Sequence, residues 1–145
     1  MNIKEVMVKK FPLIYVNEPL DKVLKILISI PESSLPVINK KKQVIGEIDQ
    51  HNLLLLDIAP EELGEESLDL NKVKLLFKKK KRTVKDFMTK HNFTLSLEDN
   101  ILDAAKLMYD EDLSTLPVVD KNKRLLGILT DISILKHYKK ILNKR

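Results

Sequence analysis

Polar side chains that could hold an anion follow a glycine in an apolar stretch near the C-terminus. Two aliphatic residues come after Gly127, and then Thr130, Asp131 and Ser133. The aliphatic run predicts a strand, and the residues after it predict a helix that begins near Asp131. A hydroxyl and unpaired backbone N–H groups face the same space at a helix start, which suits phosphate. We therefore expect an anion site around Thr130.

A β-hairpin is expected to position this site. Residues 116–119 and 124–129 are mostly apolar, and a short polar turn separates them. This pattern predicts two antiparallel strands. The lone Gly127 inside the second strand indicates that another backbone or a ligand approaches closely there, because no Cβ stands in the way.

The hairpin occurs twice, because the chain contains an internal repeat. Residues 35–39 (LPVIN) match residues 116–120 (LPVVD) with an offset of 81 residues and no gap. Each copy predicts a βαββα unit that opens with a short helical turn. One such unit is too small to bury both faces of its sheet. We expect an α+β fold in which two repeats pack around a pseudo-two-fold axis.

The repeat also predicts the domain boundaries. The first copy spans residues 1–57 and the second spans residues 84–145, and residues 58–83 form a linker that is expected to be helical. Within the copies, short strands are expected at 13–16 and 94–97, and closing helices at 49–57 and 131–142. Pro19 is expected at the first position of the first long helix, where proline is tolerated.

Composition excludes several classes of function. The chain has 145 residues, 43% of them hydrophobic, a net charge of +5 and no cysteine. No paired nucleophile and base, no glycine-rich phosphate loop and no metal-ligand spacing among its three histidines is present, so we expect neither an enzyme nor a metal site. Without a secretory signal or an apolar run of about 20 residues, we expect a cytoplasmic protein without a membrane partner.

The repeated pattern resembles the cystathionine beta-synthase (CBS) domain family. The resemblance rests on the βαββα order, on the two LPV hairpins, on the Gly-hydrophobic-hydrophobic-Thr strand end at 127–130 and on the opening VKDFMT at 84–89. It implies a paired unit, the Bateman module, that commonly senses AMP, ADP, ATP or S-adenosylmethionine. Such modules usually regulate an enzyme, channel or transporter. No such effector domain is fused in this sequence, so a stand-alone module that acts on a separate protein is expected.

The resemblance also implies the ligand-binding residues. In ligand-binding members the pattern Gly-h-h-Ser/Thr-x-x-Asp, where h is apolar, holds phosphate with the hydroxyl and ribose with the aspartate. In this chain Thr130 keeps the hydroxyl, and Ser133 stands at the position of the ribose-binding aspartate. The acid of this segment, Asp131, lies two positions earlier. The expected ligand-binding residues are Thr89, Leu116, Pro117, Val118, Thr130, Asp131 and Ser133. For Thr89, Leu116, Pro117 and Val118 the alternative is a purely structural role in the core and turns, and for Leu116 and Val118 this alternative is preferred.

The first copy is a weaker candidate site. Asp49 stands where the hydroxyl is expected, and a carboxylate there repels an anion but caps a helix well. Asn52 stands at the ribose position and can still form hydrogen bonds.

Partner expectations follow from the surface pattern. Apolar residues on the closing helices predict a homodimer. An alternative is a ligand-free protein-interaction module that keeps degenerate nucleotide sites. The basic run at 78–82 is interpreted as a solvated helix end, so no nucleic acid partner is expected.

Overall fold

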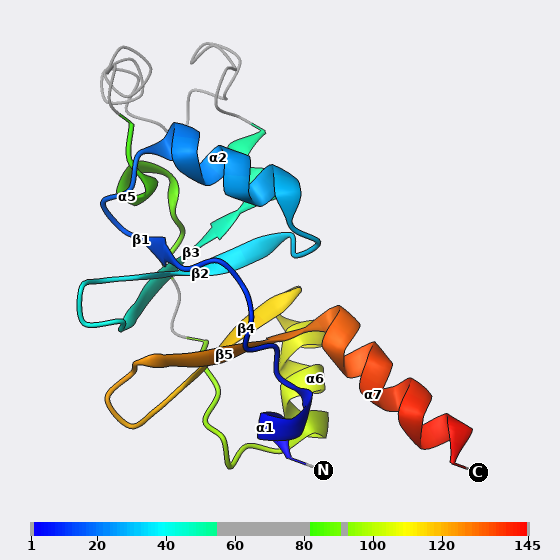
Figure 1. The fold of residues 1–145 in the computed structure, drawn as a ribbon. Helices are drawn as coiled ribbons and strands as arrows, with labels where there is room; N and C mark the ends of the chain where they lie inside the picture. Colours follow the sequence, from blue (N-terminus) through cyan, green and yellow to red (C-terminus); the bar gives the residue numbers. More distant parts are fainter. Residues whose placement is uncertain (1, 55–81, 91–92, 145) are drawn as a thin grey trace.

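The computed structural model describes residues 2–54, 82–90 and 93–144, and its ribbon is drawn in Figure 1. The first repeat contains α1 (Ile3–Val6), β1 (Ile14–Tyr15), α2 (Leu20–Ser29), β2 (Ser34–Ile38), β3 (Val44–Asp49) and α3 (Gln50–Leu53). The second contains α5 (Val84–Phe87), α6 (Ile101–Asp110), β4 (Thr115–Val119), β5 (Leu125–Thr130) and α7 (Asp131–Asn143). The predicted α+β fold of two repeats is confirmed. Most of the linker expected to be helical, residues 58–81 of 58–83, lies outside the described part, and its last two residues, Arg82 and Thr83, are not helical, because Thr83 forms a bridge with Pro19. The closing helix expected at 49–57 is described only as far as Leu54.

Both predicted hairpins are present. Strands β2 and β3 pair antiparallel, β4 and β5 do the same, and β1 adds to β2 in parallel. The register shifts between Val37 and Ile38 and, at the same repeat position, between Val118 and Val119. The two copies therefore match even in the irregularity of their hairpins.

Both predicted short strands are shorter than expected, and the one expected at 13–16 is reduced to β1 (Ile14–Tyr15). Residues 94–97 form a single parallel bridge, between Leu95 and Val118, instead of a strand. The reason is local, because the backbone N–H of Ser96 donates to Asp99 Oδ2 at 2.8 Å and the chain turns there. An aspartate side chain that bonds a nearby backbone N–H favours a turn, and that N–H group can then no longer pair with a neighbouring strand.

The long helices bury one apolar face each. Helix α2 buries Leu20, Val23 and Leu27, and α6 buries residues at equivalent spacing. This is the 3.6-residue period of an amphipathic helix. Pro19 is the N-cap of α2 and not its first residue, because its extended backbone joins a bridge to Thr83.

The opening segment of each repeat packs on the other repeat. Val84 of α5 is completely buried in the core of the first repeat, and Ile3 of α1 is completely buried in the core of the second. Figure 1 shows α1 beside α6 and α5 beside α2. Each hydrophobic core is thus completed by residues from the other copy.

Both strand glycines make room for these exchanged segments. A Cβ on Gly127 would lie 2.8 Å from Met7 Sδ and 3.0 Å from the carbonyl oxygen of Val8. A Cβ on Gly46 would lie 2.8 Å from the carbonyl oxygen of Thr89. The close approach expected at Gly127 is therefore that of a backbone segment.

The pseudo-two-fold axis passes between equivalent residues of the two copies. The hydroxyl oxygens of Ser33 and Ser114 lie 2.6 Å apart, and these residues are 81 positions apart in the chain. Near the hairpin turns, Val44 N–H donates to the carbonyl of Lys123, and Leu125 N–H donates to that of Lys42. The two hairpins are consequently joined edge to edge.

Candidate functional site

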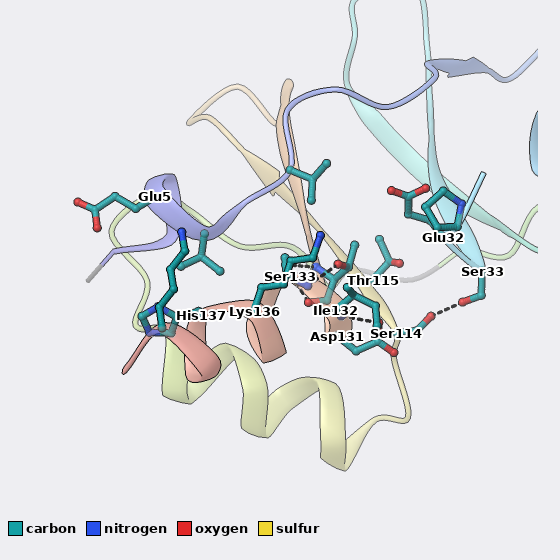
Figure 2. A pocket seen from close by; sticks show the side chains of 15 residues that line it. Glu5, Glu32, Ser33, Ser114, Thr115, Asp131, Ile132, Ser133, Lys136 and His137 are labelled. Atoms are coloured by element: carbon teal, nitrogen blue, oxygen red, sulfur yellow. Dashed lines mark hydrogen bonds between the residues drawn. The ribbon is translucent and has the colours of Figure 1, made fainter. Parts of the chain in front are cut away.

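A cavity of about 570 Å³ lies between the two repeats and against the N-terminal half of α7. Its volume is in the range of sites that hold small molecules. Three parts of the chain line it, namely the opening segment, the loop before β2, and the second repeat around β4 and α7 (Figure 2). The lining residues are Glu5, Val6, Val8, Pro31, Glu32, Ser33, Ser114, Thr115, Thr130, Asp131, Ile132, Ser133, Lys136, His137 and Lys140.

Helix α7 begins at the cavity with a reciprocal cap. Ser133 N–H donates to Thr130 Oγ1 at 3.0 Å, and Thr130 N–H donates to Ser133 Oγ at 2.9 Å. The Ser133 hydroxyl in turn donates to the carbonyl of Thr130 at 2.8 Å. A capping box of this kind satisfies backbone groups that a helix start leaves unpaired.

The cap leaves the two hydroxyls in different states. Thr130 Oγ1 only accepts a hydrogen bond, and among the described residues it has no acceptor for its own O–H group. Ser133 has already used its O–H group and one of its two acceptor positions. Thr130 can therefore donate to a ligand, whereas Ser133 has little capacity left.

Basic side chains continue from this cap along α7. Lys136 and Lys140 are one turn apart on the helix, and both line the cavity. Within the described part of the chain, neither lysine has a carboxylate at salt-bridge distance. His137 lies between them in sequence and is only 8% exposed, and no described residue bonds its Nδ1.

Acidic side chains also line the cavity, but their positions differ. Glu32 adjoins Ser33, on the side of the Ser33–Ser114 pair, and Figure 2 shows it opposite His137. Asp131 lies at the start of α7, where its Oδ1 accepts a hydrogen bond from the N–H of Ile132 at 2.8 Å. Glu5, a third acid, lines the opposite end of the cavity, on the side of His137 (Figure 2). The cavity therefore has carboxylates at both ends, and the two lysines of α7 line the wall between them.

The structure brings only part of the predicted second-repeat site together. Thr130, Asp131 and Ser133 line the cavity. Leu116 and Val118 are fully buried in the core of the second repeat, as their alternative interpretation had it. Pro117 is also buried in strand β4, where it lines a small gap separate from the cavity. None of these three β4 residues reaches the cavity.

Thr89 lies at the first-repeat site instead of at the cavity. Its backbone exchanges hydrogen bonds with Glu47 of β3, at 2.8 and 2.9 Å, and its Oγ1 accepts one from Asn52 Nδ2 at 3.3 Å. The cause is the exchange of opening segments, which carries residues 84–89 onto the first repeat. The equivalent residue at the cavity is Val8, which is apolar.

Asp49 is the N-cap of α3. Its side chain accepts a hydrogen bond from His51 N–H at 2.6 Å. This is the role that its residue type favours at a helix start. Its carboxylate stands at the position that Thr130 occupies in the second repeat.

Several lining residues were missed by sequence reasoning. Lys136 and Lys140 are three and seven positions after Ser133, so helical periodicity alone places all three on one face of α7. The loop residues Glu32 and Ser33 carry no comparable signal, because only the packing of the two repeats brings them to α7.

Two further observations concern the described residues only. No group of three or more metal-ligating side chains is present in residues 2–54, 82–90 and 93–144. In the same residues, no helix has both the length and the apolar character that a membrane span requires.

Comparison with known proteins decides the family. The CBS domain family model matches twice, at residues 3–58 and 84–140. The chain belongs to the CBS domain family. The two matches cover both repeats, so the protein is a CBS pair.

Relatives of this CBS pair occur in distant organisms. It is 32% identical to the chloroplastic CBS domain-containing protein CBSX1 of Arabidopsis thaliana, over 88% of this chain and 60% of CBSX1. It is 30% identical to a CBS domain-containing protein of Dictyostelium discoideum, over 97% of this chain and 92% of that protein. The chain thus spans less than two thirds of CBSX1.

Solved CBS pairs share the whole architecture. The structure of CBSX2 in complex with AMP superimposes with a TM-score of 0.78 and 26% sequence identity, covering 99% of this chain and 98% of that one. Another structure of CBSX2, from Arabidopsis thaliana, gives a TM-score of 0.76 over 98% of this chain and 96% of that one, at 24% identity.

Proposed function

We propose that this CBS pair is a regulatory module that senses an adenine nucleotide and acts on a separate partner protein. The observation that carries the proposal is the cavity of about 570 Å³, lined by Thr130, Lys136 and Lys140. Among the described residues, the O–H group of Thr130 has no acceptor and neither lysine has an ion-pair partner. A helix start with an available hydroxyl and nearby cations suits phosphate. The structure of the similar protein CBSX2 in complex with AMP supports an adenine nucleotide as the ligand.

The location of the cavity supports a regulatory role. A ligand there would touch the loop before β2, the opening segment and α7 at the same time. Because these parts belong to different repeats, binding would favour one relative arrangement of the repeats over others. A partner protein that recognises this arrangement would then respond to the nucleotide. The proposal assigns no catalytic step to the chain.

Calorimetric titration tests the proposal directly. Purified protein would be titrated with AMP, ADP, ATP and S-adenosylmethionine, and its melting temperature would be measured with each at millimolar concentration. We expect heat and a rise in melting temperature with at least one of them, since a ligand that binds only the folded state stabilises it. No heat and no thermal shift with any of the four would overturn the proposal.

A second candidate function is a ligand-free protein-interaction module. Its support comes from exposed apolar side chains at equivalent positions of the two repeats. Ile28 and Tyr109 form one equivalent pair, 83% and 87% exposed, and Leu54 and Leu135 form another, 69% and 57% exposed. Apolar surface of this kind is typical of interaction sites. Capture of one partner protein with equal affinity in the presence and absence of nucleotides would favour this candidate over the first.

A further inference from the structure

We propose that the cavity recognises its nucleotide through the phosphate groups and does not distinguish ribose from deoxyribose. This inference rests on the proposed function and specifies which parts of the ligand the site reads. It predicts similar affinity for ATP and dATP, and much weaker affinity for adenosine.

The first part of the proposal, that ribose and deoxyribose are not distinguished, follows from Ser133. This hydroxyl donates to the carbonyl of Thr130 and accepts from the N–H of Thr130, at 2.8 and 2.9 Å. The residue is only 8% exposed, and what remains is a single neutral acceptor position. To bond a sugar hydroxyl strongly, Ser133 would have to leave the capping box and unpair a buried N–H group, which is costly.

Asp131 does not replace the missing sugar acceptor. It is two positions before Ser133, so its side chain leaves α7 about 200° away around the helix. One of its oxygens already accepts from the N–H of Ile132. The proposal therefore leaves the 2′-hydroxyl of a nucleotide without a specific charged partner.

The second part of the proposal, that the phosphates are recognised, follows from polar groups of the cavity that have no partner among the described residues. Thr130 has an unused O–H donor, and Lys136 and Lys140 lie along the same side of the cavity without an ion-pair partner among the described residues. Figure 2 shows Lys136 and Ser133 on α7, on the side of the cavity away from Glu32. A tail of two or three phosphates would extend from Thr130 along these lysines. Charge-assisted hydrogen bonds to phosphate are the strongest polar contacts available there.

The acids of the cavity limit where the phosphates can lie. Glu32 lies beside Ser33, near the pseudo-two-fold axis. A carboxylate there repels phosphate but accepts a hydrogen bond from an amino group such as that of adenine. Glu5 lines the opposite end of the cavity, on the side of His137, so the phosphates would lie between the two acids, against Thr130 and Lys136.

The test compares ligands that differ in one group. Calorimetry would measure the Kd of ATP, dATP and adenosine with the same protein. We expect ATP and dATP to agree within about twofold, and adenosine to bind at least about tenfold more weakly, since each tenfold step corresponds to about 1.4 kcal/mol. A dATP affinity five or more times weaker than that of ATP would overturn the inference while leaving the nucleotide-sensor proposal in place.

Substitutions that remove one positive charge test the recognition of phosphate separately. Lys136→Met keeps helix propensity and most of the side-chain volume. We expect it to weaken ATP binding about fivefold, the size of a single partly exposed ionic contact. Lys139→Met is the matched control, because Lys139 is exposed on α7 and does not line the cavity. Equal effects of the two substitutions would overturn the inference. Failure of AMP, ADP, ATP and S-adenosylmethionine alike to bind would overturn the proposed function with it.

Discussion

Val8 and Ile128 exchange both of their backbone hydrogen bonds, at 2.7 and 2.9 Å, and so join the opening segment of the first repeat to β5 of the second. Thr89 and Glu47 form the equivalent pair on the other side of the pseudo-two-fold axis, at 2.8 and 2.9 Å. The two repeats are therefore interlocked, because each one supplies the segment that covers the sheet of the other.

Removing the side chain of Ile3 tests this interlock. Ile3 is completely buried, yet it lies in the core of the second repeat. We expect Ile3→Ala to lower the free energy of unfolding by about 2–5 kcal/mol. Hydrogen exchange should accelerate in α6 and α7 more than in α2. Lys4→Ala, at an exposed neighbouring position, is the control, and faster exchange confined to α2 would contradict the interlock.

The strand glycines should differ in how they tolerate alanine. In Gly46→Ala the new Cβ meets the backbone carbonyl of Thr89 at 2.8 Å, whereas in Gly127→Ala its nearest contact is the flexible Met7 side chain. We expect both to destabilise, by about 1–3 kcal/mol, and Gly46→Ala to be the worse. Urea unfolding would measure both. A larger loss for Gly127→Ala would contradict this order and would mean that Met7 cannot move or that the Val8 carbonyl, 3.0 Å from the new Cβ, is the harder contact.

Ser133 should matter for stability before it matters for binding. Ser133→Ala leaves the buried N–H of Thr130 unpaired and is expected to cost about 1–3 kcal/mol. Ser133→Asp should keep the fold, because an aspartate already serves this position in the capping box of Thr83 and Asp86.

Ser133→Asp also leads to a prediction about recognition of the sugar. Ser133→Asp adds a carboxylate beside the proposed nucleotide, so it should prefer ATP over dATP, unlike the wild-type protein. Calorimetry with both nucleotides and urea unfolding would measure these effects. A preference that stays unchanged would place the sugar away from residue 133.

We expect the stability of the second hairpin turn to depend on pH through the carboxylate of Asp120. The backbone N–H of Arg124 donates to this carboxylate and lowers the pKa of Asp120, a shift that the N–H of Asn122 and the charge of Arg124 reinforce. A lowered pKa stabilises the fold at pH values above the unfolded pKa of about 3.9. That contribution is lost as the pH falls through the pKa of the folded state.

Asn39 indicates which substitution of Asp120 tests this pH dependence. At the equivalent position of the first repeat, its Oδ1 accepts from the N–H groups of Lys41 and Gln43 without any charge. We expect Asp120→Asn to keep the turn and to lose less stability than the wild type between pH 7 and pH 3. Urea midpoints at both pH values would measure this. Equal losses would mean that the Asp120 charge contributes nothing.

The exposed helix faces should mediate self-association. Leu135 and Leu54 occupy equivalent positions and are largely exposed. We expect the wild type to form a dimer and Leu135→Glu to shift it toward the monomer, because a carboxylate would be buried in the interface. Light scattering after size-exclusion chromatography would measure the mass. Lys139→Glu serves as the control, and a monomeric wild type would contradict this prediction.

The repeat made most of the fold predictable, whereas the site was predictable only in part. The offset of 81 residues and the two hairpins follow from local patterns that do not depend on how the copies pack. The exchange of opening segments depends on packing between residues far apart in the chain, so sequence reasoning assigned Thr89 to the wrong repeat. Leu116 and Val118 show a related limit, since a pattern of apolar residues does not reveal which face of the strand a cavity adjoins.

Chemical-shift mapping by nuclear magnetic resonance tests the central claim most directly. Backbone amide shifts of the labelled protein would be followed during titration with ATP. We expect the largest changes at residues 130–137, at Ser114 and Thr115, and at Val8, all around the cavity. Changes centred on Thr89 and Asn52, on the hairpin turns at 39–43 and 120–124, or on no residues at all would contradict it.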